Sequence, residues 1–314
     1  MPSKTDFNVS PYYDDFTESK KFHRVMYRPA YAVQARELTT QQSITQDQIE
    51  KFADHMFEHG AMVVPGQVEP DMHYNAVKLT SLTGTLADYN GTQVVGGTSG
   101  VSADVVNVVV TDGTDPDTLF VKYRNSGTDN VSSVFTDGET LTSSAGTAVV
   151  STTAQGAAVK IEAGTYYING FFVAVDEQTL ILDKYTNTPS YRVGLVISES
   201  FITSTDDTSL LDNATGSSNA NAAGAHRFKI DLTLSKLSLT STADASFVEL
   251  MRINSGTVVN KVTSTDYSVL EDTLARRTFD ESGDYVIRNF DLDPREHLIS
   301  GTNRGIYAAD STSA

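Results

Sequence analysis

Residues 165–175 read TYYINGFFVAV and carry the strongest local signal in the chain. Two apolar runs rich in aromatic and β-branched residues flank the pair Asn169-Gly170. Both positions of a two-residue hairpin turn require a positive φ angle, which Asn and Gly tolerate. The stretch therefore predicts two antiparallel strands joined by a tight turn.

The sequence around this hairpin predicts many further short strands. Runs of apolar, aromatic and β-branched residues alternate with turns rich in Asp, Gly, Asn and Ser. The polar stretch 203–226 interrupts this pattern and predicts an ordered irregular loop or a surface lobe. Strands are expected at residues 73–79, 104–111, 118–123, 131–135, 148–161, 179–182, 191–202, 227–234, 246–253, 257–262 and 284–290.

Two stretches predict helices. Residues 35–59 contain neither Gly nor Pro, and Gly60 follows them as a C-terminal glycine. Residues 266–279 can form a short amphipathic helix that Asp266 caps.

The fold class expected from these elements is α+β and mainly β. We expect one long N-terminal helix, a β-rich body with an inserted small all-β domain of sandwich or barrel type, and a short C-terminal helix. The predicted divisions are an aromatic arm at 1–34, the long helix and first strands at 35–83, the inserted domain at 84–163, a β-rich domain with the short helix at 164–295, and a linker-like tail at 296–314.

Composition excludes several functions. Lys and Arg number 23 against 40 Asp and Glu, and the resulting net charge of -17 argues against nucleic-acid binding. The chain has no Cys, which removes disulfides, thiolate metal sites and Cys nucleophiles. No apolar run approaches the roughly 18 to 20 residues that cross a bilayer, and the N-terminus lacks the apolar stretch of a signal peptide. We therefore expect a protein made in a cytosol without membrane insertion.

The predicted long helix carries a 3-4 repeat of the coiled-coil type. This stripe is either the helix face buried on its own domain or a seam through which copies associate around an axis. Its polar members weaken the seam. The six positions are Leu38, Thr45 and Phe52, with Gln42, Ile49 and Met56 between them.

The candidate functional residues are assembly residues. The aromatic arm is expected to pack on another surface, because a polar tail rarely carries so many rings. The assembly candidates are Tyr12, Tyr13, Phe16 and Phe22 of the arm and Leu38, Ile49, Phe52 and Met56 of the helix.

Chemistry-bearing motifs are weak, and we predict no catalytic, cofactor or metal site. His55, Glu58 and His59 form an H-x-x-E-H pattern that could chelate zinc on a helix, but the pattern still requires a third ligand and a cleft. The acids at 112–117 resemble a calcium loop without its closing Glu, and turn formation explains them.

Three blocks of sequence resemble one family. They are FNVSPYYDDF at 7–16 with FHRV at 22–25 and RPAYAVQAREL at 28–38, then LLDNATGSSNANAAGAHR at 210–227, then LARRTFDESGDY at 274–285. The blocks are similar, in the same order, to a virion-protein domain of tail fibres and baseplate proteins of tailed bacteriophages, especially contractile-tailed phages of cyanobacteria. The resemblance covers residues 1–80 and 160–295. Ala30, Thr40, Gln42 and Thr45 depart from the residues expected there.

The resemblance implies a structural protein of the phage tail, made in the host cytoplasm and located in the virion. Such a subunit would anchor or begin a host-recognition fibre, as a homotrimer that binds other tail and baseplate proteins and, at the fibre, a host surface receptor. The family offers no catalytic residues and no cofactor. One alternative is a receptor- or glycan-binding adhesin module that uses the Tyr and Asp loops of residues 84–163. A remote alternative is a zinc enzyme built on His55, Glu58 and His59.

Overall fold

The computed structural model describes residues 5–64, 66–128, 131–242, 246–262 and 268–283. The chain divides into two compact units, Met1–Leu270 and Glu271–Ala314. The second unit contains most of helix α2 (Ser268–Ser282). The bounds of this helix are close to those predicted for the short C-terminal helix, 266–279. The strand expected at 284–290 and the tail expected at 296–314 lie outside the described residues.

The protein is mainly β, with 42% strand and 16% helix. Every strand pairing in the described residues is antiparallel. Neither helix has the length and apolar character needed to cross a membrane, as far as the described residues extend. The strands are β1 (Met62–Val64), β2 (Val68–Leu82), β3 (Gln93–Gly96), β4 (Ser102–Val109), β5 (Thr118–Asn125), β6 (Thr140–Thr142), β7 (Thr147–Ile161), β8 (Gly164–Ile168), β9 (Phe171–Val175), β10 (Gln178–Asp183), β11 (Tyr191–Ile202), β12 (Arg227–Ser238), β13 (Phe247–Asn254) and β14 (Thr257–Lys261).

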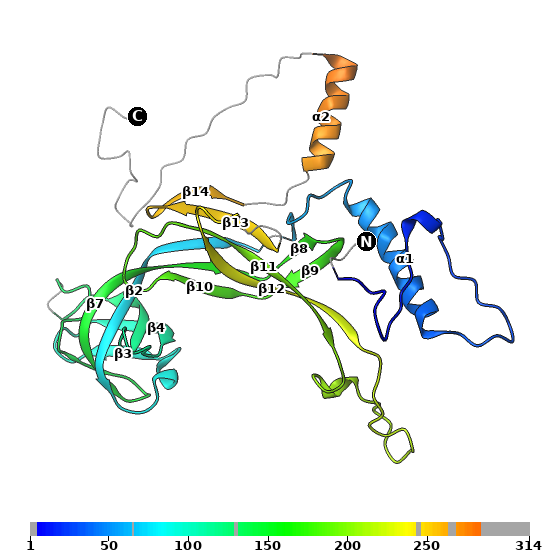
Figure 1. Cartoon of the computed structure of the whole chain (residues 1–314). Coiled ribbons are helices and arrows are strands. Elements are labelled where there is room, and N and C mark those ends of the chain that lie inside the picture. The colour runs from blue at the N-terminus through cyan, green and yellow to red at the C-terminus, as the bar shows by residue number, and fades with distance from the viewer. Residues whose placement is uncertain (1–4, 65, 129–130, 243–245, 263–267, 284–314) are drawn as a thin grey trace. The chain divides into compact units, whose positions relative to one another are not determined.

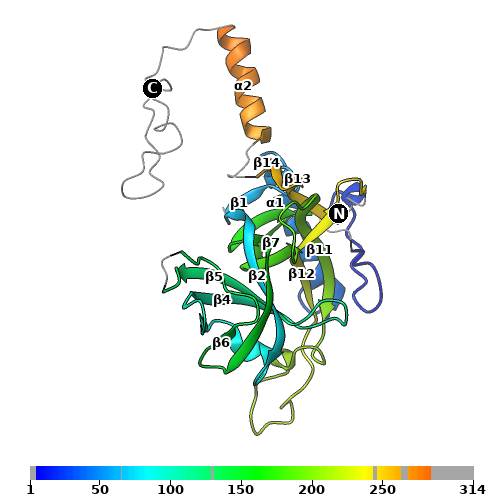
Figure 2. The same cartoon turned by 90° about the vertical axis from the view of Figure 1, so that its left-hand side faces the viewer.

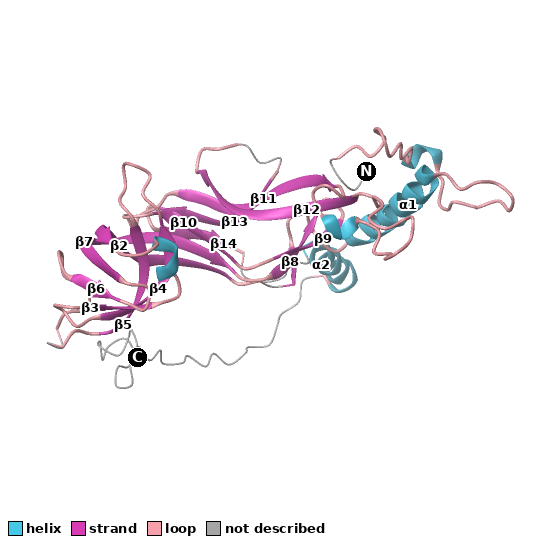
Figure 3. Cartoon of the chain, turned by 90° about the horizontal axis from the view of Figure 1, so that it is seen from below, coloured by secondary structure: helices cyan, strands magenta, loops and turns pink. Residues whose placement is uncertain are grey.

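A small barrel forms one end of the first unit (Figures 1 and 3). The seven-stranded sheet has the order β10-β7-β2-β5-β4-β3-β6, and β6 also pairs with β7, so the sheet closes on itself. Alternate side chains of the strands fill the interior, as the period of two in a strand requires. This interior is apolar, and its fully buried members include Val77, Val94, Leu119 and Leu141.

Strands β2 and β7 continue out of the barrel. Figure 2 shows them running from the barrel to the second sheet. Beyond the barrel, β7 pairs with β10, and this part of the sheet packs on the four-stranded sheet β12-β11-β13-β14. The shared core contains Val68, Val159 and Ile161 from one layer and Leu195 and Leu250 from the other.

The predicted hairpin at 165–175 is confirmed. Asn169 and Gly170 have φ angles of 48° and 85°, and Ile168 pairs with Phe171 across the turn. Strand β1 adds to β8, which completes a three-stranded sheet.

Helix α1 spans Ala35–Ala53, so it ends before the predicted boundary at residue 59. The chain turns there because Phe57 folds back to contact the ring of Tyr167 at a centroid distance of 6.0 Å. Gly60 has a φ angle of 89°, and its N–H donates to the Tyr167 carbonyl at 2.8 Å. The glycine therefore belongs to this turn and not to a helix terminus.

Two further expectations are corrected or refined. Residues 131–135 form no strand, although they are described; Phe135 instead lies buried, with its ring 5.2 Å from that of Tyr123. The loop at 203–226 is ordered and irregular, with a short helix, η3 (Thr208–Leu210), and an isolated bridge between Leu211 and Ala223.

Candidate functional site

The candidate functional surface is the exposed face of α1. Its body-facing side buries Ile44, Asp47 and Ala53. Among the apolar members of the heptad stripe, Leu38 is 51% exposed, Ile49 42% and Phe52 69%. For these three residues, the interpretation of the stripe as a face buried on its own domain is wrong. We call Leu38, Ile49 and Phe52 the α1 stripe.

A buried carboxylate holds the first half of α1 against the arm. Asp14 is 1% exposed. Its Oδ1 accepts a hydrogen bond from Thr40 Oγ1 at 2.9 Å, and its Oδ2 accepts one from the Ser43 hydroxyl. The backbone N–H of Phe16 also donates to Oδ1, at 3.2 Å. The helix therefore presents hydroxyl groups to its own chain and apolar side chains away from it.

The hairpin fixes the second half of α1. Gln46 Nε2 donates to the carbonyl of Gly170 at 2.6 Å. The Tyr167 hydroxyl donates to Asp54 Oδ1 at 2.6 Å and to the Glu50 carbonyl at 3.3 Å. Burial, followed by the hydrogen bond to Asp54, raises the pKa of Tyr167 well above its ordinary value. Tyr167 therefore stays protonated and keeps donating.

The arm packs on the aromatic ends of β11 and β12. Phe7 meets Phe228 edge to face at a centroid distance of 4.9 Å, and Tyr12 stacks on Phe201 at the same distance. The Tyr12 hydroxyl also lies 2.7 Å from Nδ1 of His226. The arm packs on a surface as predicted, and that surface belongs to this chain.

The structure divides the eight predicted assembly residues into two groups. Tyr12 is half-buried against Phe201, Phe16 is buried, and Met56 is half-buried against the small core around Tyr167. These three side chains make their contacts within this chain. Segments distant in the sequence cover them, so the local pattern could not reveal it. The other five, Tyr13, Phe22, Leu38, Ile49 and Phe52, are exposed.

The arm also exposes apolar side chains that the sequence prediction did not select. They lie in a segment without regular structure, so no periodicity marks them. The only available signal was the apolar character of residues 26–33. Within residues 26–33 the exposed members are Met26 at 74%, Tyr27 at 44%, Tyr31 at 63% and Val33 at 53%, and Val9 is also exposed, at 41%.

The H-x-x-E-H pattern lies outside the helix. His55 and His59 follow the end of α1 at Ala53, so the helical spacing that a zinc site requires is lost. Nδ1 of His59 accepts a hydrogen bond from the N–H of Asn169 at 3.3 Å. Within the described ranges, no cluster of three or more His, Cys, Asp or Glu residues could hold a metal ion.

The acids that resemble a calcium loop bind a lysine. Nζ of Lys184 lies 2.9 Å from Asp112 Oδ2 and 2.8 Å from Asp115 Oδ2. Hydrogen bonds from the backbone N–H of Asp115 and from Lys184 hold the pKa of Asp112 well below its usual range. Asp117 accepts a hydrogen bond from the N–H of Thr111 at 2.8 Å. These contacts explain the cluster as a loop that Lys184 ties to the body.

Together, these features define a mainly antiparallel β protein whose N-terminal helix presents an uncovered apolar stripe. The chain belongs to the family described as Domain of unknown function (DUF4815), whose model matches residues 10–132 and 118–304. The comparison with curated proteins gave no match, and the comparison with solved structures gave none either.

Proposed function

We propose that this chain is a structural assembly subunit whose copies associate through the α1 stripe. The observation that carries the proposal is the exposure of Leu38, Ile49 and Phe52 on a helix that already buries its opposite face. Surface helices normally turn their apolar side chains to their own core. A heptad-spaced stripe that faces outward is complementary to another copy of itself around a symmetry axis.

Electrostatics favour an apolar association. The net charge of -17 makes copies of the chain repel one another. The α1 stripe carries no charged side chain, and the exposed rings and aliphatic groups of the arm add apolar area near it. Tyr27 links the two surfaces, because its hydroxyl donates to Gln41 Oε1 of α1 at 2.7 Å.

We further propose a homotrimer in a phage tail, at the baseplate or at the start of a host-recognition fibre. The resemblance of residues 7–38, 210–227 and 274–285 to tail-fibre and baseplate domains supports this placement. In this arrangement, other tail proteins are the neighbours of the arm and of α1. The barrel, which includes much of the region predicted as an inserted all-β domain, points away from that contact. The role is structural and not enzymatic.

Light scattering on the full chain tests the proposal. We expect a particle near three times 34.0 kDa. The double substitution Ile49→Ser and Phe52→Ser should dissociate it, because the copies lose their apolar contact. Both side chains are exposed, so the circular dichroism of the variant should match that of the wild type.

A matched control uses two exposed valines on the barrel. Val106 is 45% exposed and Val110 65% exposed. The double substitution Val106→Ser and Val110→Ser removes a similar kind of surface and should leave the particle mass unchanged. A monomeric wild type at high concentration, or an Ile49→Ser and Phe52→Ser variant with the wild-type mass, contradicts the proposal.

A further inference from the structure

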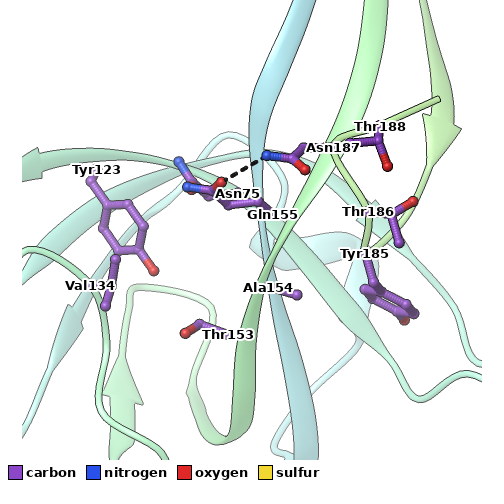
Figure 4. Close-up of a pocket in the computed structure, with 10 residues that line it drawn as sticks. All are labelled: Asn75, Tyr123, Val134, Thr153, Ala154, Gln155, Tyr185, Thr186, Asn187 and Thr188. Atoms are coloured by element: carbon purple, nitrogen blue, oxygen red, sulfur yellow. Dashed lines mark hydrogen bonds between the residues drawn. The ribbon is translucent and has the colours of Figure 1, made fainter. Parts of the chain in front are cut away.

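A pocket of about 530 Å³ lies beside the strands β2 and β7, where they leave the barrel (Figure 4). This volume falls within the range of ~300–1,000 Å³ that is usual for small-molecule sites. Asn75 of β2 and Gln155 of β7 stand opposite each other in the strand register and contribute its floor. The segment after β10 contributes Tyr185 and Asn187, and Tyr123 of β5 lines the other side.

The lining of the pocket is neutral, although the chain carries a net charge of -17. None of its side chains is a carboxylate, an ammonium, a guanidinium or an imidazole; they are amides, hydroxyls, tyrosine rings and two small aliphatic groups. Of the two neighbouring lysines, Lys184 pairs with Asp112 and Asp115, and Lys78 places its ammonium over the ring of Tyr185. The lining itself therefore offers hydrogen bonds from neutral groups alone.

The amides are available to a ligand. Asn187 Nδ2 donates to Gln155 Oε1 at 3.3 Å, which orients the two side chains (Figure 4). In the described part of the chain, the Asn75 amide has no hydrogen-bond partner. A side-chain amide offers two donors and one acceptor, so Asn75 can bind two adjacent hydroxyl groups of one ligand.

The two tyrosine rings are held in place. The Tyr185 hydroxyl lies 2.8 Å from Thr118 Oγ1, and Nζ of Lys78 lies over the Tyr185 ring at 3.7 Å from its centroid. The Tyr123 hydroxyl accepts a hydrogen bond from the N–H of Phe135 at 3.4 Å. Fixed rings and oriented amides lose little conformational entropy when a ligand binds.

We propose that this pocket binds a neutral saccharide. A sugar presents adjacent hydroxyl groups to amides and Thr hydroxyls, and apolar C–H faces to aromatic rings. A site built to hydrogen-bond such hydroxyls discriminates against ligands that lack them, because its polar groups would be left unpaired. Phosphorylated, sulfated or carboxylated sugars find no cation among the lining side chains.

A peptide strand is the competing occupant. The strand register pairs β7 with β6 through Val149 and with β10 from Ala157 onward, which leaves residues 151–156 paired on the β2 side alone. An extended peptide could add to such an edge. The six residues are short for strand addition, and the side chains around them supply no apolar socket for a peptide anchor. The neutral polar lining therefore favours the sugar.

The test uses the full chain on an array of neutral oligosaccharides that also carries sialylated and sulfated ones, followed by saturation-transfer NMR titration of the neutral sugar that binds best. Asn187 is exposed, so Asn187→Ala should fold normally, and Asn75→Ala provides a second variant. Each loses a hydrogen-bonding amide, and we expect the dissociation constant to rise about fivefold to tenfold. The matched control Asn213→Ala, in the exposed loop 203–226, should bind as the wild type does.

Several outcomes overturn the proposal. They are binding to no neutral glycan, binding confined to charged glycans, and an affinity that neither Asn187→Ala nor Asn75→Ala changes. Protection of the amides at 151–156 by an added peptide, without competition from the sugar, assigns the pocket to strand addition. The result is independent of assembly through α1, because no residue of the pocket belongs to the arm or to that helix.

Discussion

At the residue scale, two adjacent buried tyrosines differ in whether the hydroxyl has a hydrogen-bond partner. Tyr166 and Tyr167 are 0% and 1% exposed, and they point to opposite faces of β8. The Tyr167 hydroxyl donates to Asp54 Oδ1, whereas the Tyr166 hydroxyl has no hydrogen-bond partner in the described structure. Burial raises the pKa of Tyr166 to about 12, so it stays protonated as well.

The substitution Tyr166→Phe should leave the free energy of unfolding unchanged or raise it by about 1 kcal/mol, because it removes an unsatisfied buried hydroxyl. The neighbouring substitution Tyr167→Phe should lower it by about 1–2 kcal/mol, because the bond to Asp54 is lost. Urea denaturation followed by circular dichroism measures both values. The pair serves as its own control, since each variant deletes one oxygen atom. A clear loss of stability in Tyr166→Phe would show that its hydroxyl has a partner.

Glu139 is a buried carboxylate that no sequence motif indicates. It is 4% exposed, and it accepts hydrogen bonds from the N–H groups of Ser99 at 2.9 Å and Thr136 at 2.7 Å. Burial alone would raise the pKa of this carboxyl, but these hydrogen bonds lower it below its ordinary value. A Cβ on Gly96 would lie 2.6 Å from Glu139 Oε2, so the glycine leaves room for the carboxylate.

At the scale of elements, the arm and α1 depend on each other through Asp14. The substitution Asp14→Ala removes the acceptor of Thr40 and Ser43 and leaves the N–H of Phe16 without its carboxylate. We expect the arm to detach from α1 and limited proteolysis to cut within residues 5–34 several times faster than in the wild type.

Asp15→Ala is the control for this prediction. Asp15 forms an exposed ion pair with Lys20 at 3.0 Å, and such pairs contribute little to stability. Its loss should leave the cleavage rate near that of the wild type. Equal rates in Asp14→Ala and the wild type would mean that the aromatic contacts of Phe7 and Tyr12 suffice to hold the arm.

The elements also show what the sequence could predict. The hairpin at 165–175 was predictable because an Asn-Gly turn is a local signal. The end of α1 was not, because Phe57 leaves the helix direction to reach Tyr167, more than a hundred residues away in the sequence. The short strands β3 and β6 have 4 and 3 residues, too few to show an alternating pattern. They pair with each other at Val95 and Thr142, which are distant in the sequence, and this pairing helps to close the barrel.

The candidate site was predictable in part. The heptad spacing selected Leu38, Ile49 and Phe52, but it could not tell an outward stripe from a buried one. That choice depends on Asp14, Thr40 and Ser43, which supply a polar inner face that no hydrophobic pattern reveals. The pocket beside β2 and β7 joins residues from five separate segments, so no linear motif marks it.

At the scale of the whole molecule, charge decides how assembly responds to salt. Copies with a net charge of -17 repel, and the Debye length falls to ~10 Å at 0.1 M salt and ~3 Å at 1 M. If apolar burial drives association, added sodium chloride should strengthen the particle or leave it unchanged. Sedimentation velocity across a salt series measures this.

The Ile49→Ser and Phe52→Ser variant supplies the reference for the salt series. It should remain dissociated at every salt concentration, because screening restores no apolar contact. Dissociation of the wild type on adding salt would show that ion pairs, and not the α1 stripe, hold the copies together.

Strands β2 and β7 have a mechanical consequence. Each runs without interruption from the barrel into the layer that packs on the second sheet, and they pair with each other along that path, from Val68 opposite Ile161 to Leu82 opposite Ala148. The ladder shifts register between Asp71 and Tyr74 and on both sides of Leu79, so a pull along the strands is shared by the hydrogen bonds of each regular stretch between these points. Because both strands are continuous, tension applied to the barrel also passes into the second layer through the covalent chain. This part of the molecule can therefore transmit tensile load.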